Sequence, residues 1–215
     1  MRKVLLIGGG ISVLEGIDQG LWSQIKNKEL WSLNYSVMYM PYSATRELWT
    51  DIKFFKENAE ELQILEQKGV KCYAKTHVYY NTILQIQQIN CTREQSNKID
   101  LYIGERGFVG MFGLSLAVKE NYDEIFLLGY DFGVQPKDRD KKLTHWYQRY
   151  GFNKYSAGVG VPEVYLLKDN KIHRSVKDFD VYKDYKNIYN VSMDSNINTF
   201  AKITWEEFFS KIKEK

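Results

Sequence analysis

Cysteine, long apolar runs and one-sided charge are all scarce in this 215-residue sequence. The two cysteines, Cys72 and Cys91, lack the spacing of a metal or redox motif, which favours a reducing compartment. No apolar run approaches the ~20 residues that a membrane span requires. The start, Met1-Arg2-Lys3, leads directly into an apolar run without the pattern of a secretion signal. We therefore expect a cytoplasmic protein without a membrane span.

Charge is balanced, and metal-ligand spacings are few. The net charge is +3, and the densest basic stretch, Lys137 to Lys142, alternates with aspartates. This is typical of a solvated loop and gives no nucleic-acid signature. His-x-x-x-His and Cys-x-x-Cys spacings are absent, and Asp138-Arg139-Asp140 falls in the same charged stretch. We expect no metal ligands.

Aromatic residues, in contrast, are abundant. Hydrophobic residues make up 44% of the chain and aromatic residues 15%, including 16 tyrosines and 5 tryptophans. The length fits one domain, residues 1–215, with an ordinary core. The surplus of rings fits either an aromatic-lined cleft or a tyrosine-rich surface, and composition does not decide between them.

Apolar runs of strand length alternate with helical patterns, which predicts an α/β fold with a mostly parallel sheet flanked by helices. Strands are expected at Val4–Gly8, Trp31–Val37, Val70–Thr76, Glu124–Leu128 and Ile188–Val191, with a further short element at Leu48–Phe55. Helices are expected at Ser12–Lys28, Asn58–Lys68, Gly110–Asn121, Lys177–Tyr185 and Thr204–Lys213. Residues 77–100 are interpreted as an edge hairpin and residues 134–162 as a lid loop. Thr204 with Glu207 predicts a helix-capping box.

The first strand ends in a glycine turn, Gly8-Gly9-Gly10-Ile11-Ser12. Such a turn brings backbone N–H groups to a helix N-terminus, where a phosphate binds readily. The dinucleotide fingerprint Gly-x-Gly-x-x-Gly requires glycine at the position of Val13. The turn therefore predicts a mononucleotide or nucleotide-sugar site, although the same turn also occurs without a ligand.

Polar residues follow several expected strands. They are Ser12, Asn34, Asp51 and Asp131. Each could simply cap a helix or satisfy a turn, but a parallel sheet would bring all of these strand ends to one edge, where ligands bind.

Histidine supplies the candidates for acid–base chemistry, because its ordinary pKa lies near neutrality. Among the three histidines, His145 lies in the expected lid beside Tyr147, and His173 follows further along. For His77, a structural role is the favoured interpretation.

The segment from Arg106 to Phe132, RGFVGMFGLSLAVKENYDEIFLLGYDF, resembles bacterial lipooligosaccharide sialyltransferases. The likeness is carried by the residues Arg106, Gly110, Gly129, Asp131 and Phe132, and by Gly8, Gly10 and Ser12 at the amino end. Asn34, Asp51 before Phe54-Phe55, and the turn Ser192–Asn196 extend it. The same pattern is similar to a broader Rossmann-like group, many of whose members are carried by phages. That group includes archaeal 6-hydroxymethylpterin pyrophosphokinase-like proteins.

The resemblance implies a single Rossmann-like domain that holds a nucleotide through the first glycine turn and the Gly110 turn. The residues implied in binding are Gly8, Gly10, Ser12, Asn34, Asp51, Arg106, Gly110, Asp131 and Asn196. The family's lid histidine corresponds to either His145 or His173, and Tyr147, Tyr150 and Tyr155 are candidates for its lid tyrosines. Phe108-Val109 stands where the family has Thr-Ser.

Three functions are compatible with this sequence. The first is a metal-independent glycosyltransferase that needs no cofactor and moves a sugar from a nucleotide-activated donor, such as a CMP-sialic-acid-like compound, to a hydroxyl acceptor. The second is an ATP-dependent pterin diphosphokinase-like enzyme, which would need Mg²⁺ held by Asp51 and Asp131. The third is a non-enzymatic nucleotide-binding protein, for example a phage protein. A homo-oligomer remains open in each case.

Overall fold

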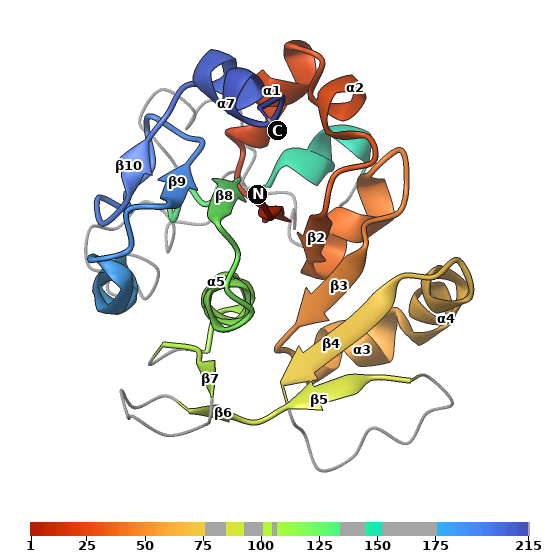
Figure 1. Cartoon of the computed structure of the whole chain (residues 1–215). Helices are drawn as coiled ribbons and strands as arrows, with labels where there is room; N and C mark the ends of the chain where they lie inside the picture. The colour runs from red at the N-terminus through yellow and green to blue at the C-terminus, as the bar shows by residue number, and fades with distance from the viewer. Residues whose placement is uncertain (76–84, 93–100, 105–106, 134–144, 152–175, 215) are drawn as a thin grey trace.

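The structure is a computed structural model that describes residues 1–75, 85–92, 101–104, 107–133, 145–151 and 176–214. Its centre is an eight-stranded sheet with the order β10-β9-β8-β1-β2-β3-β4-β5 (Figure 1). The strands are β1 (Lys3–Ile7), β2 (Leu30–Leu33), β3 (Arg46–Trp49), β4 (Lys71–Lys75), β5 (Gln87–Ile89), β8 (Glu124–Leu128), β9 (Ile188–Asn190) and β10 (Ala201–Lys202). Every pair of neighbours in this sheet is parallel, which confirms the expected α/β class with helices flanking the sheet.

The chain order reverses next to β1. From β1 the chain moves outward through β2, β3, β4 and β5, and it later returns to pair β8 with the other side of β1. Ile7 is in register with Ser32 on one side and with Leu128 on the other. The carboxyl ends of β1 and β8 therefore meet at a topological switch point, where ligands of open α/β sheets bind.

Two apolar layers cover the sheet, because the central strands are buried on both faces. Leu5 and Ile7 of β1 belong to a cluster with α1 (Val13–Asp18), α2 (Leu21–Ile25) and α7 (Trp205–Lys211). Val4 and Leu6 belong to a second cluster with α5 (Val109–Lys119). Figure 1 shows α5 on the opposite side of the sheet from α1, α2 and α7. Two further helices, α3 (Ile52–Glu57) and α4 (Ala59–Gln67), contribute to the first cluster.

Three expected elements differ from the structure in their bounds or their type. The helix expected over Ser12–Lys28 is divided into α1 and α2, because Gly20 adopts a φ of +84°. The strand expected over Trp31–Val37 ends at Leu33, and a 3-10 helix, η1 (Asn34–Tyr39), follows from a φ of +53° at Asn34. The helix expected at Lys177–Tyr185 is the 3-10 helix η5 (Val176–Tyr182).

The edge hairpin expected at 77–100 is wrong for the residues that the structure describes. β5 pairs in parallel with β4, and the short strands β6 (Cys91–Thr92) and β7 (Leu101–Tyr102) also pair in parallel. The element expected at Leu48–Phe55 separates into the end of β3 and α3, and β10 was not expected.

The C-terminal capping box is confirmed. Thr204 Oγ1 accepts from the Glu207 backbone N–H at 3.2 Å, and Glu207 Oε2 accepts from the Thr204 backbone N–H at 2.8 Å. No helix within the described ranges is long and apolar enough to cross a membrane.

Candidate functional site

A pocket of about 230 Å³ lies at the carboxyl ends of β1, β2 and β8. It is lined by Gly8, Gly9, Gly10, Leu33, Asn34, Phe108, Val109, Gly110, Gly129, Tyr130, Asp131, Phe132, Gly133, His145 and Tyr147. This volume belongs to the described part of the chain and is somewhat below the roughly 300–1,000 Å³ of small-molecule sites. The lining combines apolar and aromatic side chains with a small number of polar groups, as is usual for such sites.

The first glycine turn is held tightly against the end of β8. The Gly8 N–H donates to the Leu128 carbonyl at 2.8 Å, and the Gly10 N–H donates to the Gly129 carbonyl at 2.9 Å. A Cβ atom at Gly10 would lie 2.6 Å from the Gly129 oxygen and equally close to the Asp131 carboxylate. The sequence has glycine here because no side chain fits between the two turns.

Asp131 places a carboxylate at the start of α1. Its Oδ2 accepts from the Ser12 backbone N–H at 2.8 Å, and its Oδ1 accepts from the Ser12 hydroxyl. This is the position where the sequence predicts a phosphate, because anions are favoured at helix N-termini. α1 has only six residues, and a negative group of the protein already lies at its first turn.

His145 lies directly over the glycine turn. A Cβ atom on Gly9 would be 2.5 Å from His145 Cδ2. The imidazole stacks on the Tyr147 ring with centroids 5.1 Å apart, and Tyr147 stacks on Tyr39 at 5.7 Å. The side chain is half-buried, and burial lowers its pKa from 6.5 to about 4. The imidazole is therefore neutral at pH 7 and able to accept a proton.

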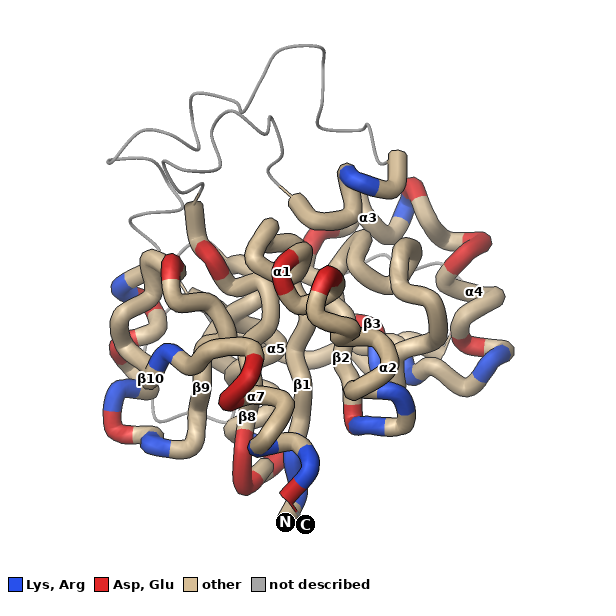
Figure 2. Tube along the Cα trace, turned by 90° about the horizontal axis from the view of Figure 1, so that it is seen from above, with Lys and Arg blue, Asp and Glu red and all other residues tan. Residues whose placement is uncertain are grey.

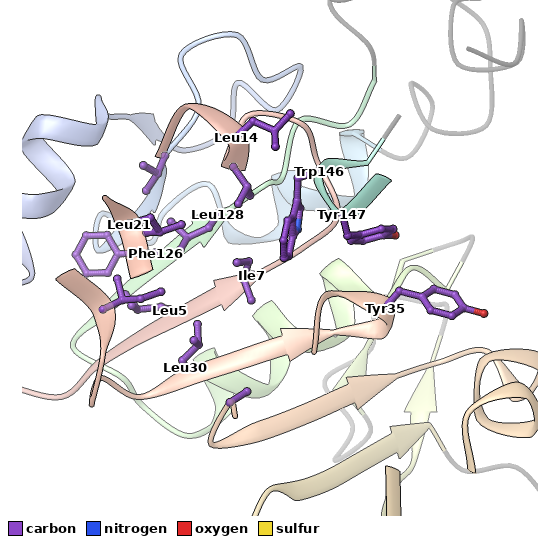
Figure 3. Packing of buried hydrophobic residues seen from close by; sticks show 14 of the residues in the cluster. Leu5, Ile7, Leu14, Leu21, Leu30, Tyr35, Phe126, Leu128, Trp146 and Tyr147 are labelled. Carbon is purple, nitrogen blue, oxygen red and sulfur yellow. The ribbon is translucent and has the colours of Figure 1, made fainter. Parts of the chain in front are cut away.

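The segment that carries His145 is anchored to the glycine turn by its neighbour Trp146. The Trp146 backbone N–H donates to the Gly9 carbonyl at 3.0 Å, and its indole Nε1 donates to the Gly8 carbonyl at 2.9 Å. Trp146 is fully buried in the first cluster, together with Ile7 and Leu128 (Figure 3). Residues 145–151, the described part of the expected lid loop, thus include a 3-10 helix, η3 (Trp146–Tyr150), packed on the sheet.

The opposite wall is aromatic and lies at the N-terminus of α5. The rings of Phe108 and Phe132 meet edge to face with centroids 5.8 Å apart, and Phe132 has a φ of +49°. The Tyr130 hydroxyl donates to the Gly110 carbonyl at 3.0 Å, and complete burial raises the pKa of Tyr130. This wall can receive a planar ring, because aromatic side chains pack well against other π-systems.

Asn34 presents an amide at the end of β2. Its Oδ1 is buried and has no hydrogen-bond partner among the described residues. The left-handed backbone at this residue is one that asparagine tolerates better than most side chains. A buried acceptor without a donor is unusual in a native fold, so a ligand N–H or O–H is a natural partner for it.

Several candidates fall elsewhere. Asp51 is exposed and caps α3, where its side chain accepts from the Lys53 N–H at 2.8 Å, and it does not line the pocket. Asn196 supports the β8 turn from behind: its backbone N–H donates to the Asp131 carbonyl at 2.9 Å and its Nδ2 to the Phe132 carbonyl at 2.8 Å. Arg106 and His173 lie outside the described residues, as do the other sequence candidates His77 and Tyr155.

The site thus contains Gly8, Gly10, Asn34, Gly110, Asp131, His145 and Tyr147 from the sequence predictions, while Ser12 is bound to Asp131. Sequence reasoning missed the apolar lining at Leu33, whose only signal is adjacency to Asn34. It named Val109 and Tyr130 beside motif residues without assigning either a role in binding. Among the lining residues that the structure describes, Asp131 is the one acidic side chain and none is lysine or arginine. Figure 2 shows much of the Lys and Arg colouring at the outer loops and near the chain termini.

Comparison with known proteins gives no relative for this chain: no family model, no curated protein and no solved structure matches it.

Proposed function

We propose that this chain is a metal-independent glycosyltransferase that binds a nucleotide-activated sugar in the switch-point pocket. The observation that carries the proposal is the neutral imidazole of His145, which lies over Gly9 and beside Tyr147 at the meeting point of β1 and β8. A hydroxyl acceptor needs a base at this place, and histidine is the side chain most often used for that purpose.

The aromatic wall supports a nucleoside as the part of the ligand held by the protein. A base would lie against Phe108 and Phe132, because every nucleobase has a π-face that stacks on such rings. Asn34 Oδ1 would accept from a ligand donor, and Asp131 would accept from a sugar hydroxyl. The donor phosphate is expected near the first turn of α5, at Gly110, since Asp131 repels an anion at the first glycine turn.

The transfer step is a single displacement. The acceptor hydroxyl gives its proton to a ring nitrogen of His145, and its oxygen forms a bond to the anomeric carbon. The bond from that carbon to the phosphate oxygen breaks, and the nucleotide leaves with the electron pair. A base with a pKa of about 4 is weak, but the negative charge of the bound donor raises that pKa toward neutrality. The donor thereby strengthens the base that acts next to it.

The pterin diphosphokinase alternative is less well supported by the positions of its two proposed Mg²⁺ ligands. Asp51 caps α3 away from the pocket, whereas both carboxylate oxygens of Asp131 accept from Ser12. Two carboxylates that face different surroundings do not present a shared cation site. The glycosyltransferase proposal does not require Asp51 and Asp131 to bind a metal ion together.

The test measures both binding and turnover. Thermal unfolding is followed with CMP-, UDP-, GDP- and ADP-sugars, with and without Mg²⁺, and nucleotide release is then measured with the donor that stabilises the protein. His145→Gln should keep donor binding and lose at least about 100-fold in turnover, the lower range for a general base. His77→Gln is the control, because a structural role is the favoured interpretation of His77, and we expect it to retain turnover. His173→Gln tests the other candidate for the lid histidine.

Three results would contradict the proposal. They are stabilisation by none of the nucleotide-sugars, full turnover in His145→Gln, or binding without any release of nucleotide. Release of AMP from ATP with a hydroxymethylpterin and Mg²⁺ would favour the diphosphokinase. Binding alone would favour the non-enzymatic alternative.

A further inference from the structure

One acidic residue is buried in the middle of the sheet, outside the pocket. Glu47 of β3 has no solvent exposure, and register pairs it with Ser32 of β2 on one side and Cys72 of β4 on the other. The row lies on the face of the sheet that carries the first apolar cluster. A carboxyl group in such a place is costly compared with an apolar side chain of similar size, so packing does not account for it.

The interactions of Glu47 are directed at the end of β2. Its Oε2 accepts from the Ser32 hydroxyl, and the backbone N–H of Asn34 also interacts with the carboxyl, lowering its pKa. Burial outweighs both effects and leaves the pKa well above its ordinary value of 4.5. Burial therefore favours the protonated form of this carboxyl. Its other oxygen, Oε1, has no hydrogen-bond partner among the described residues.

The end of β2 forms part of the pocket wall, at Leu33 and Asn34. β2 stops at Leu33, and Asn34 turns the chain with a φ of +53° into η1, so its N–H leaves the strand ladder. Further along η1, the Ser36 hydroxyl donates to the Gly8 carbonyl at 3.0 Å, and Tyr39 stacks on Tyr147. The orientation of this corner thus affects two walls of the pocket, and the Glu47 carboxyl lies beneath it.

We propose that Glu47 is a positioning residue: its buried carboxyl fixes the corner between β2 and η1 and thereby aims the amide of Asn34 into the pocket. The carboxyl itself does not touch the ligand. The effect on Asn34 follows from the fold alone, whereas the effect on ligand affinity rests on the proposed function.

The first experiment needs no ligand. The backbone and side-chain amide signals of Asn34 are recorded by NMR in the wild type and in Glu47→Gln, Glu47→Asp and Glu47→Leu. Gln has the length of Glu and keeps an oxygen that can accept from the Ser32 hydroxyl, so the signals should stay in place. Asp is one methylene too short to reach, and Leu has no polar group, so both should displace the signals. If the Glu47→Leu variant does not fold, the Glu47→Asp variant still decides the test.

The matched control is Ser115→Ala. Ser115 is also buried, and its hydroxyl donates to the Tyr102 carbonyl on the α5 side of the sheet. Ser115→Ala removes this hydrogen bond and the one that the Ser115 hydroxyl accepts from the Tyr182 hydroxyl, without touching the corner, so the Asn34 signals should not move. Unmoved Asn34 signals in Glu47→Asp, or equal displacement in Ser115→Ala, would overturn the proposal.

The second experiment measures CMP affinity. Asn34→Ala and Glu47→Asp should each weaken binding about fivefold, the loss expected for one hydrogen bond between neutral groups. The double variant should be no weaker than Asn34→Ala, because Glu47 acts through Asn34. Additive losses would overturn the proposal. If the wild type binds neither CMP nor any other nucleotide, the proposed function fails, and the NMR result still decides the role of Glu47.

Discussion

Protonation of His145 should destabilise the folded protein by an amount that the structure fixes. The pKa of His145 is 6.5 in the unfolded chain and about 4 in the folded one, because burial withholds water from the charged imidazole and so disfavours it. The folded state therefore binds fewer protons than the unfolded state between these values. Stability is fully present above pH 6.5 and is lost as the pH falls toward 4. The complete difference corresponds to about 3 kcal/mol.

The measurement compares the wild type with His145→Gln, which cannot titrate in this range. Urea unfolding is carried out at several pH values from 7.5 to 5, and the difference in unfolding free energy between the two proteins is plotted. This difference should change by about 2 kcal/mol over that range, with the wild type losing more as the pH falls. His173→Gln and His77→Gln serve as controls, and each should leave the slope due to His145 unchanged.

An independent assay follows the imidazole signal of His145 in the folded protein by NMR. Its midpoint should lie well below 6.5 in the free protein and should rise when a nucleotide-sugar binds. A midpoint near 6.5, or parallel pH profiles for the wild type and His145→Gln, would refute the argument that burial controls this group. A low midpoint that does not move on donor binding would refute the coupling between donor and base.

Three further variants test the packing around the site and the C-terminal helix. Gly10→Ala should cost about 1–3 kcal/mol and impair ligand binding, because the added Cβ meets backbone and the Asp131 carboxylate; unchanged urea unfolding would contradict this. Ser12→Ala removes a hydroxyl bond to the same carboxylate and should cost about 1.5–3 kcal/mol by urea unfolding, whereas a neutral effect would show that the contact is unimportant. Thr204→Ala should cost about 1 kcal/mol through loss of the cap to Glu207, read as a lower thermal midpoint with ligand affinity unaltered.

The sheet could be predicted from the sequence because each strand carries its own local pattern. The runs 4–7 and 125–128 are apolar throughout, and this is what strands buried on both faces require. The corner at Asn34 could not be predicted in the same way, because the apolar pattern continues past Leu33 while the backbone does not. A positive φ at asparagine leaves no periodic signal.

The sequence predicted where the pocket lies, but not the charge of the groups that line it. A glycine turn favours an anion in general, but here Asp131, in the turn after β8, approaches Ser12 from 119 residues away in the sequence. Such a contact depends on the β1–β8 pairing, which the sequence pattern implies only loosely. The same limit applies to His145, whose low pKa comes from packing over Gly9 rather than from neighbours in sequence.

The reversal of strand order beside β1 also has a consequence for synthesis. β1 is made before β8, so one of its two sides stays unpaired until β8 follows, more than 115 residues later. Until then, an apolar strand has a bare edge, the kind of edge that pairs with other chains. Nascent chains that end before Glu124 should therefore aggregate readily. The pocket, which needs both turns and η3, should appear only after Tyr150 has left the ribosome.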